Sequence, residues 1–199
     1  MQTIFKMAMC AALAGVMMFS VSEAQAKQLT FTNLNPVAPH FGGGAWFVAG
    51  AGSNGPYTVA QSFKPQIAGT LDYLDIPLTN VGQGAGYLGT GANVALVEDN
   101  GSGRPKTGPA LEDWVVAKLP VTSPPTLKAT HVTSKLHPSL STSKTYWVVV
   151  GVGAYDEYAY WWNTTNANSP KGVLDSHDGA FSWTAYPTST GPALDVWIQ

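Results

Sequence analysis

Glycine and proline interrupt nearly every window of this chain that is long enough to hold a helix. The 199 residues include 21 glycines and 14 prolines, and inside a helix these residues cost about 1 and about 3 kcal/mol relative to alanine. Between the interruptions, short apolar or alternating runs recur at close intervals, a pattern typical of a β-sandwich or barrel. The sequence therefore predicts an all-β fold without helices.

About ten strand candidates follow one another without a linker-like break. They lie at residues 29–31, 59–63, 74–78, 94–97, 114–119, 128–134, 146–152, 158–163, 181–185 and 194–198. The run from Tyr146 to Val152 is apolar on both faces, which indicates a central strand buried on both sides. We therefore expect one antiparallel, jelly-roll-like β-sandwich domain over residues 27–199.

Residues 1–26 have the pattern of a cleaved signal peptide. Lys6 makes the start positive, residues 7–19 form an apolar stretch too short to span a bilayer, and Ala24-Gln25-Ala26 is a small-x-small cleavage site. An N-terminal membrane anchor is the alternative. Cleavage would remove all five methionines and the only cysteine, Cys10. The mature chain would then be free of disulfides, and we expect it to be exported, either extracellular or periplasmic.

Charged residues are few and scattered. The formal net charge is −2, and it is unchanged by loss of residues 1–26, which carry Lys6 and Glu23. Arg104 is the only arginine. Nucleic-acid binding needs a clustered basic face and anionic lipid attracts polybasic segments, and neither pattern is present. The expected partners are an extracellular polysaccharide or a surface protein, with no nucleic acid and no membrane span after cleavage.

Two glycine-rich stretches, Phe41–Pro56 and Asn80–Gly91, are predicted to be long loops. The first begins with a His-Phe-Gly-Gly-Gly sequence similar to the oxyanion loop of esterases, but the chain lacks the Gly-x-Ser-x-Gly elbow that such enzymes need. Residues 84–89 match G-x-G-x-x-G, yet no helix is expected after them to hold a pyrophosphate. Neither stretch therefore predicts an active site.

Three motifs stand in a fixed order in the rest of the chain. They are Ala-Gln-Ser-Phe-Lys-Pro at residues 60–65, the Asp99-Asn100-Gly101 hairpin with Pro105 at residues 95–105, and residues 136–147, which end in Tyr146-Trp147. With Trp183 and an apolar closing strand, their order resembles the choice-of-anchor R domain of exported bacterial proteins over residues 57–199. The resemblance implies a jelly-roll-like sandwich on a secreted or surface protein and assigns no biochemical role.

The chain departs from this family pattern in two places. Ser143 stands where a glycine is usual. The sorting tail that often follows such domains does not follow Gln199, so we expect a free exported protein rather than an anchored one.

Several polar clusters have ligand or catalytic chemistry. Oxygens for calcium are offered by one group, Glu98, Asp99, Asn100 and Ser102, and by a second group, Asp175 and Asp178. A turn or an exposed acidic edge explains both groups without metal, so no cofactor is predicted. Structural calcium is the less favoured alternative, and the metal ligands are unknown. The four histidines lack zinc-ligand spacing.

Catalytic carboxylates and a catalytic triad also need consideration. Ser176-His177-Asp178 spells a triad in sequence, but real triads assemble from distant residues. Asp156 and Glu157 are adjacent, so on a strand they would diverge, although two acids that converge from elsewhere could cleave glycosidic bonds. A secreted hydrolase is therefore the third of three functional hypotheses.

Aromatic residues near the end of the chain carry the main functional prediction. If residues 158–162 form a strand, Tyr158, Tyr160 and Trp162 share one face and Trp161 points to the other. A row of rings on one sheet face matches the apolar faces of successive sugar units, whereas packing inside the sandwich is the alternative. In that alternative, Trp161 is the exposed ring. The predicted ligand-binding residues are Tyr155, Tyr158, Tyr160, Trp161, Trp162 and Trp183.

The sequence thus favours a secreted, non-catalytic β-sandwich that binds polysaccharide through exposed aromatic side chains. The first alternative is a structural or adhesive protein of the extracellular matrix or cell surface, whose edges or aromatic residues contact other proteins.

Overall fold

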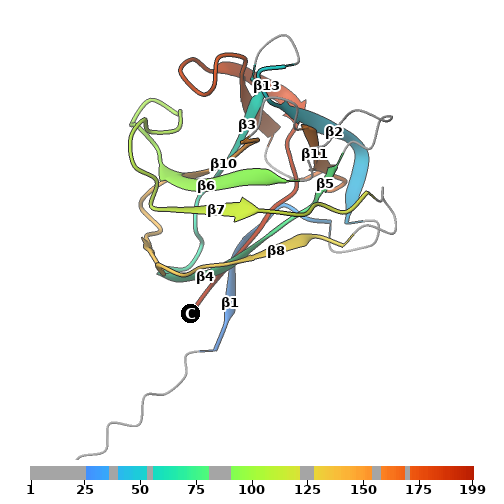
Figure 1. The fold of residues 1–199 in the computed structure, drawn as a ribbon. Helices are drawn as coiled ribbons and strands as arrows, with labels where there is room; N and C mark the ends of the chain where they lie inside the picture. The colour runs from blue at the N-terminus through green and yellow to red at the C-terminus, as the bar shows by residue number, and fades with distance from the viewer. Residues whose placement is uncertain are drawn as a thin grey trace, which may run out of the picture.

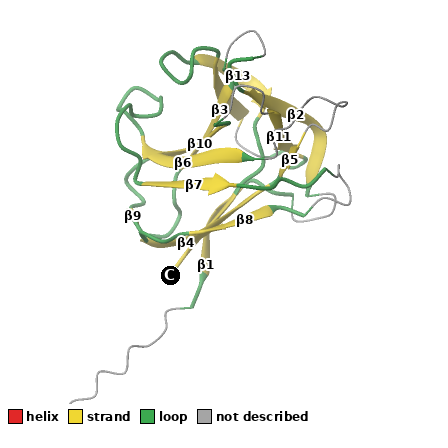
Figure 2. Ribbon diagram, in the orientation of Figure 1, coloured by secondary structure: helices red, strands yellow, loops and turns green. Residues whose placement is uncertain are grey.

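The computed structural model describes residues 26–35, 40–52, 56–80, 91–121, 128–153, 158–168 and 171–199. These residues form fourteen strands and no helix. Figure 2 shows the strands and the loops that connect them. Every pairing between the named strands is antiparallel. No described helix is long and apolar enough to span a bilayer. The predicted all-β, antiparallel sandwich is confirmed, with more strands than the ten expected.

The strands are arranged in three sheets (Figure 1). The five-stranded sheet has the order β1 (Gln28–Thr32), β14 (Asp195–Ile198), β4 (Gly69–Ile76) and β8 (Thr130–Thr133), with β9 (Ser139–Leu140) also paired to β4. The six-stranded sheet has the order β13 (Thr184–Thr190), β12 (Lys171–Ser176), β3 (Thr58–Phe63), β10 (Tyr146–Gly151), β6 (Ala92–Glu98) and β7 (Glu112–Val116). The three-stranded sheet has the order β2 (Phe41–Ala49), β11 (Tyr158–Thr164) and β5 (Leu78–Asn80).

One apolar core joins all three sheets. Its fully buried members include Val48 on β2, Leu74 on β4, Val148 on β10, Trp161 on β11 and Val196 on β14. Because these strands belong to three different sheets, the six-stranded sheet packs through this core against the other two. Each sheet therefore has one face in the core and one outer face.

Strand β10 is buried on both faces, as its sequence predicts. Tyr146, Val148 and Val150 belong to the main core, whereas Trp147 and Val149 belong to a second apolar cluster on the opposite face of the sheet. Strand β10 is paired with β3 on one side and with β6 on the other, so it is an interior strand of its sheet. Tyr146 thus enters the core, and Trp147 finds a second layer.

The Asp99 turn helps to cover Trp147. One carboxylate oxygen of Asp99 accepts hydrogen bonds from the backbone amides of Gly101 (2.7 Å) and Gly103 (3.3 Å). The other oxygen accepts a hydrogen bond of 2.8 Å from Trp147 Nε1. Gly101 and Gly103 have φ angles of 87° and 73°, which glycine adopts without steric cost. The hairpin motif of the sequence is therefore a turn that also accepts the hydrogen bond of the largely buried Trp147 indole.

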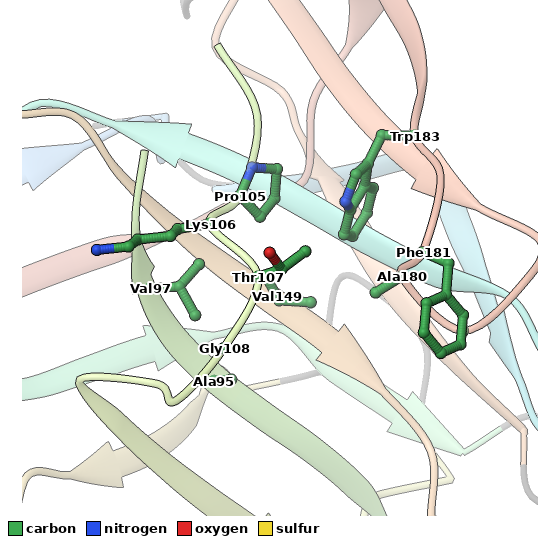
Figure 3. Close-up of a pocket in the computed structure, with 11 residues that line it drawn as sticks. Ala95, Val97, Pro105, Lys106, Thr107, Gly108, Val149, Ala180, Phe181 and Trp183 are labelled. Carbon is green, nitrogen blue, oxygen red and sulfur yellow. The ribbon is translucent and has the colours of Figure 1, made fainter. Parts of the chain in front are cut away.

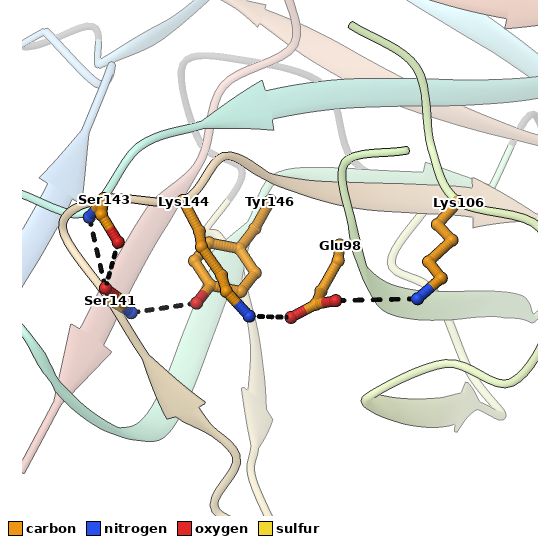
Figure 4. Close-up of polar contacts among 6 residues, drawn as sticks. All are labelled: Glu98, Lys106, Ser141, Ser143, Lys144 and Tyr146. Carbon is orange, nitrogen blue, oxygen red and sulfur yellow. Dashed lines mark hydrogen bonds and ion pairs between the residues drawn. The ribbon is translucent and has the colours of Figure 1, made fainter. Parts of the chain in front are cut away.

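Polar contacts beside this turn connect β6 to the start of β10 (Figure 4). Glu98 lies between two lysines, with Lys144 Nζ at 2.7 Å and Lys106 Nζ at 3.9 Å from its carboxylate oxygens. The hydrogen bond from Lys144 is the main cause that lowers the pKa of Glu98. The Tyr146 hydroxyl accepts a hydrogen bond of 2.9 Å from the Ser141 amide.

Four strands, β2, β5, β9 and β12, were not expected from the sequence, and the strand expected at residues 181–185 begins only at Thr184. Strand β2 covers most of the stretch predicted as the first glycine-rich loop, so that prediction is wrong for residues 41–49. The three glycines of β2, Gly42, Gly43 and Gly44, have φ angles of 143°, 70° and 155°, so the strand begins with a backbone that other residues rarely adopt. Strands β9 and β12 are short and carry too few apolar residues for a clear pattern. Residues 81–90 of the second predicted loop lie outside the described residues.

Candidate functional site

Strand β11 divides its aromatic residues between two faces. Tyr158, Tyr160 and Trp162 are partly exposed, whereas Ala159 and Trp161 are fully buried and belong to the core. The indole Nε1 of Trp161 donates a hydrogen bond of 2.8 Å to the Ala193 carbonyl, so the buried ring has its polar partner. The expected alternation along residues 158–162 is confirmed.

Trp161, predicted as a ligand-binding residue, is therefore a core residue in this structure. Its side chain is 0% exposed, and a ligand could reach it only if the sandwich opened. The alternative in which Trp161 is the exposed ring and the row is core is also wrong. The physical reason is the period of the strand, which places Trp161 on the same face as buried Ala159.

The outer face of the three-stranded sheet carries a continuous series of rings, which we call the aromatic platform: Phe47, Tyr57, Tyr158, Tyr160 and Trp162. Phe47 is central, with ring centroids 5.8 Å from Tyr57, 5.6 Å from Tyr158 and 5.8 Å from Tyr160. Tyr160 in turn lies 6.1 Å from Trp162. All five residues are partly exposed. The rings thus form one contiguous surface.

Strand pairing and one hydrogen bond hold the platform in place. Phe47 on β2 lies directly opposite Tyr160 on β11, so their rings meet as a cross-strand pair. Trp162 Nε1 donates a hydrogen bond of 2.9 Å to Oγ1 of Thr79 on β5, a residue that is buried. Trp162 also packs against the small apolar cluster of Phe41 and Ala193. The platform rings therefore lie on β2 and β11 with Tyr57 beside them, and β5 anchors Trp162 through Thr79.

Among the described residues, an ionisable pair adjoins one end of the platform. None of its five residues ionises as a carboxylate or ammonium, and the adjoining His177 ring lies 4.3 Å from the ring of Tyr57. His177 Nε2 is 3.2 Å from a carboxylate oxygen of Asp175, which is 7% exposed. The negative charge of Asp175 is also the main cause that raises the pKa of Tyr186. The described platform is an apolar, aromatic surface with a His–Asp pair at its edge.

Of the remaining predicted ligand residues, the structure describes Trp183, which is not on the platform. Tyr155 lies outside the described residues. Trp183 is 9% exposed and packs in the second apolar cluster, on the outer face of the six-stranded sheet with Trp147 and Leu174. The structure therefore brings together three of the six predicted residues and places Trp183 elsewhere.

The polar clusters form turns in the structure. Asp178 accepts hydrogen bonds from the hydroxyls of Ser176 and Ser182, and these two bonds are the main causes that lower its pKa to about 2. Ser176 therefore bonds Asp178, and His177 contacts Asp175, so the three adjacent residues do not have the arrangement of a triad. Among the residues that the structure describes, no group of three or more His, Cys, Asp or Glu side chains could hold a metal ion. Asp156 and Glu157 lie outside the described residues.

The structure also brings together two carboxylates that sequence reasoning missed. Asp75 on β4 lies directly opposite Asp195 on β14, on the outer face of the five-stranded sheet. The pKa of Asp195 is raised to about 6, mainly by burial; the charge of Asp75 also raises it, while a hydrogen bond from Thr32 lowers it. Asp75 contacts His131 Nδ1 at 2.9 Å. Cross-strand spacing explains the meeting, because residues far apart in sequence face each other across a ladder.

Comparisons with known proteins do not place this chain. No family model matches it, and no curated protein matches it. The resemblance to choice-of-anchor R domains therefore stays a prediction from its motifs.

Sequence reasoning missed Phe47 and Tyr57 as platform residues. Phe47 lay in a stretch read as a loop, although Trp46, Phe47 and Val48 follow one another there as large residues. In the structure Val48 is buried and Phe47 faces outward, which is the alternation of a half-buried strand. A strand assignment at residues 45–49 would have added Phe47 to the row. No comparable pattern marks Tyr57, which joins the platform through a bridge to Ala49.

Proposed function

We propose that this protein is an exported, non-catalytic β-sandwich that binds an uncharged polysaccharide on the aromatic platform. The observation that carries the proposal is the contiguous, partly exposed series from Tyr57 through Phe47 and Tyr160 to Trp162. Export rests on the signal-peptide pattern of residues 1–26.

The chemistry of the platform supports a sugar ligand. Aromatic rings offer large, rigid contact area to the apolar faces of pyranose rings, and tyrosine adds a hydroxyl that hydrogen-bonds at the edge. Four of the five rings come from the adjacent strands β2 and β11, so they are held by the ladder rather than by a loop. A surface fixed before binding loses less conformational entropy when the ligand arrives.

The charge distribution favours a neutral polymer over an acidic one. Uronic-acid or sulfated polymers need cations at the site, because arginine and lysine are the usual partners of anionic groups. The five platform residues carry no cation, and the adjoining histidine is already beside the Asp175 carboxylate. We therefore place neutral glucans, xylans and mannans ahead of alginate or pectate as ligands.

Affinity electrophoresis in gels that contain each neutral or acidic polymer tests the proposal, with calorimetry on matching oligosaccharides. We expect Tyr160→Ala and Phe47→Ala to weaken binding of a neutral polymer by at least about tenfold, because these rings lie at the centre of the platform. Both variants should keep the circular dichroism spectrum of the wild-type protein.

Tyr73→Ala is the matched control. Tyr73 is also a partly exposed tyrosine on the outer face of a sheet, where it stacks on Trp197 with centroids 5.4 Å apart, but it belongs to the five-stranded sheet. Its loss should leave binding unchanged. Absence of binding to every neutral polymer, or binding that Tyr73→Ala abolishes and Tyr160→Ala does not, would contradict the platform as the site.

A further inference from the structure

A groove of about 280 Å³ lies on the outer face of the six-stranded sheet, away from the platform (Figure 3). We call it the outer groove. Its floor is formed by Ala95, Val97 and Val149, one wall by the loop from Pro105 to Gly108, and the other by residues 179–183 with Trp183.

The groove is hollow because the strands beneath it carry small side chains. Across the sheet, Leu174, Ala60, Val149 and Ala95 are aligned by strand pairing on this face. Alanine side chains at two of the four positions do not fill the space between the two loops. The two large rings, Phe181 and Trp183, belong to the loop on one side of the groove. They therefore lie beside the hollow and do not fill it.

The groove presents little polar chemistry. Among the labelled lining residues, Thr107 has a hydroxyl, and Lys106 directs its ammonium away from the floor (Figure 3), toward Glu98 at 3.9 Å. Sugars and small polar ligands need several convergent hydrogen-bonding groups in their sites. An apolar side chain is the better occupant.

The same face carries the most exposed large apolar residues of the described chain. Phe181, at the rim of the groove, is 87% exposed. Val115 on edge strand β7 is 77% exposed, and it lies on the groove side because its neighbour Asp113 is paired with Ala95 of the floor. A projecting ring and a hollow of suitable chemistry therefore occur together on one surface.

Charge on the two walls is also complementary. Lys106 lies on one wall, and Asp178 lies in the loop that forms the other. The hydrogen bonds that Asp178 accepts hold its pKa at about 2, so the carboxylate stays ionised at neutral pH. A two-fold axis along the groove would bring the Lys106 wall of each copy against the Asp178 wall of the other.

We propose that the outer groove is a self-association surface, in which Phe181 of one copy packs against the groove of a second copy of this chain. A two-fold dimer uses the same patch on both subunits, so a patch that holds both a projecting ring and a hollow is self-complementary. The proposal is independent of the platform, which lies on another sheet.

Sedimentation velocity of the purified protein, over about 1 to 200 µM, tests the proposal. The wild-type protein should show a concentration-dependent monomer–dimer equilibrium. Phe181→Ser should weaken dimerisation by at least about tenfold, because buried aromatic residues dominate such interfaces. Lys106→Glu should weaken it by a smaller factor, because it places like charges across the interface.

Leu136→Ser is the matched control, since Leu136 is 69% exposed and does not line the groove. It should leave the equilibrium unchanged. A wild-type protein that stays monomeric throughout the range overturns the proposal, as does a dimer that Phe181→Ser leaves intact. Binding of a polysaccharide that Phe181→Ser abolishes in a monomeric protein would assign the groove to sugar instead.

Discussion

The aromatic platform and the outer groove lie on outer faces of the same sandwich, yet they are built in opposite ways. On the platform, large rings project from paired strands and meet one another, as Phe47 and Tyr160 do. On the six-stranded sheet, the strands present small residues such as Ala95, and the rings of Phe181 and Trp183 come from a loop. Large cross-strand pairs give a flat surface, and small ones leave a hollow. The first suits an extended polymer and the second a single projecting side chain.

The largest effect should come from comparing the two faces of β11. Trp161→Ala removes a fully buried ring and its hydrogen bond to Ala193, so we expect it to lower the free energy of unfolding by about 3–5 kcal/mol. Trp162→Ala removes a partly exposed ring and should cost only about 1–2 kcal/mol. Urea unfolding followed by circular dichroism measures both.

The same pair also separates stability from binding. Trp162→Ala should weaken polysaccharide binding in folded protein, whereas a folded fraction of Trp161→Ala should bind with wild-type affinity. Equal destabilisation by the two substitutions would show that the platform is part of the core, and the contrast between the two surfaces would then fail.

Much of the fold could be predicted because its signals are local. The run Tyr146–Val152 is apolar on both faces, and β10 is accordingly the strand with an apolar cluster on each side. The alternation at residues 158–162 correctly separated Tyr160 and Trp162 from Trp161. It could not say which face was the inner one, because both faces of β11 carry aromatic residues. Only the packing of the whole sheet decides that.

What the sequence could not show depends on contacts between distant residues. Phe47 joins the platform because β2 pairs with β11, and Asp75 meets Asp195 because β4 pairs with β14. No single segment of the sequence determines the order of strands in a sheet, so neither of these contacts has a local sequence signal. Trp183 is predicted as a ligand-binding residue in addition to the row, but the loop after β12 carries it to another sheet face.

The Asp99 turn supports the outer groove from one side. Asp99→Ala removes acceptors for Trp147 Nε1 and for two turn amides, so we expect it to lower the free energy of unfolding by about 2 kcal/mol. Because the turn leads to Pro105 in the groove wall, dimerisation should weaken as well, while polysaccharide binding should not change. Unfolding in urea and sedimentation velocity test the two parts separately.

Asp113→Ala is the control for Asp99→Ala, because Asp113 is an exposed aspartate on the same sheet face. It should change the free energy of unfolding by less than about 0.5 kcal/mol. Equal effects of the two substitutions on stability would contradict the role of the Asp99 hydrogen bonds in supporting Trp147.

The smallest expected effect concerns the outer face of the five-stranded sheet. There, Tyr73 and Trp197 stack beside the paired carboxylates of Asp75 and Asp195. The pKa of Asp195 is about 6 in the folded protein against an ordinary value of 3.8, so the folded state holds its proton more tightly. Stability should therefore fall as pH rises from about 4 to 6. Asp195→Asn should raise the free energy of unfolding by about 1–2 kcal/mol at pH 7.5 and have little effect near pH 4.

Asp178→Asn should show the opposite pH dependence, which makes it a control of matched chemistry. The pKa of Asp178 is lowered to about 2, so its stabilising effect is present above pH 3.8 and is lost as pH falls toward 2. Chemical unfolding at a series of pH values distinguishes the two variants. If Asp195→Asn leaves the free energy of unfolding at pH 7.5 unchanged, the folded protein does not raise the pKa of Asp195, and its pairing with Asp75 does not destabilise the fold.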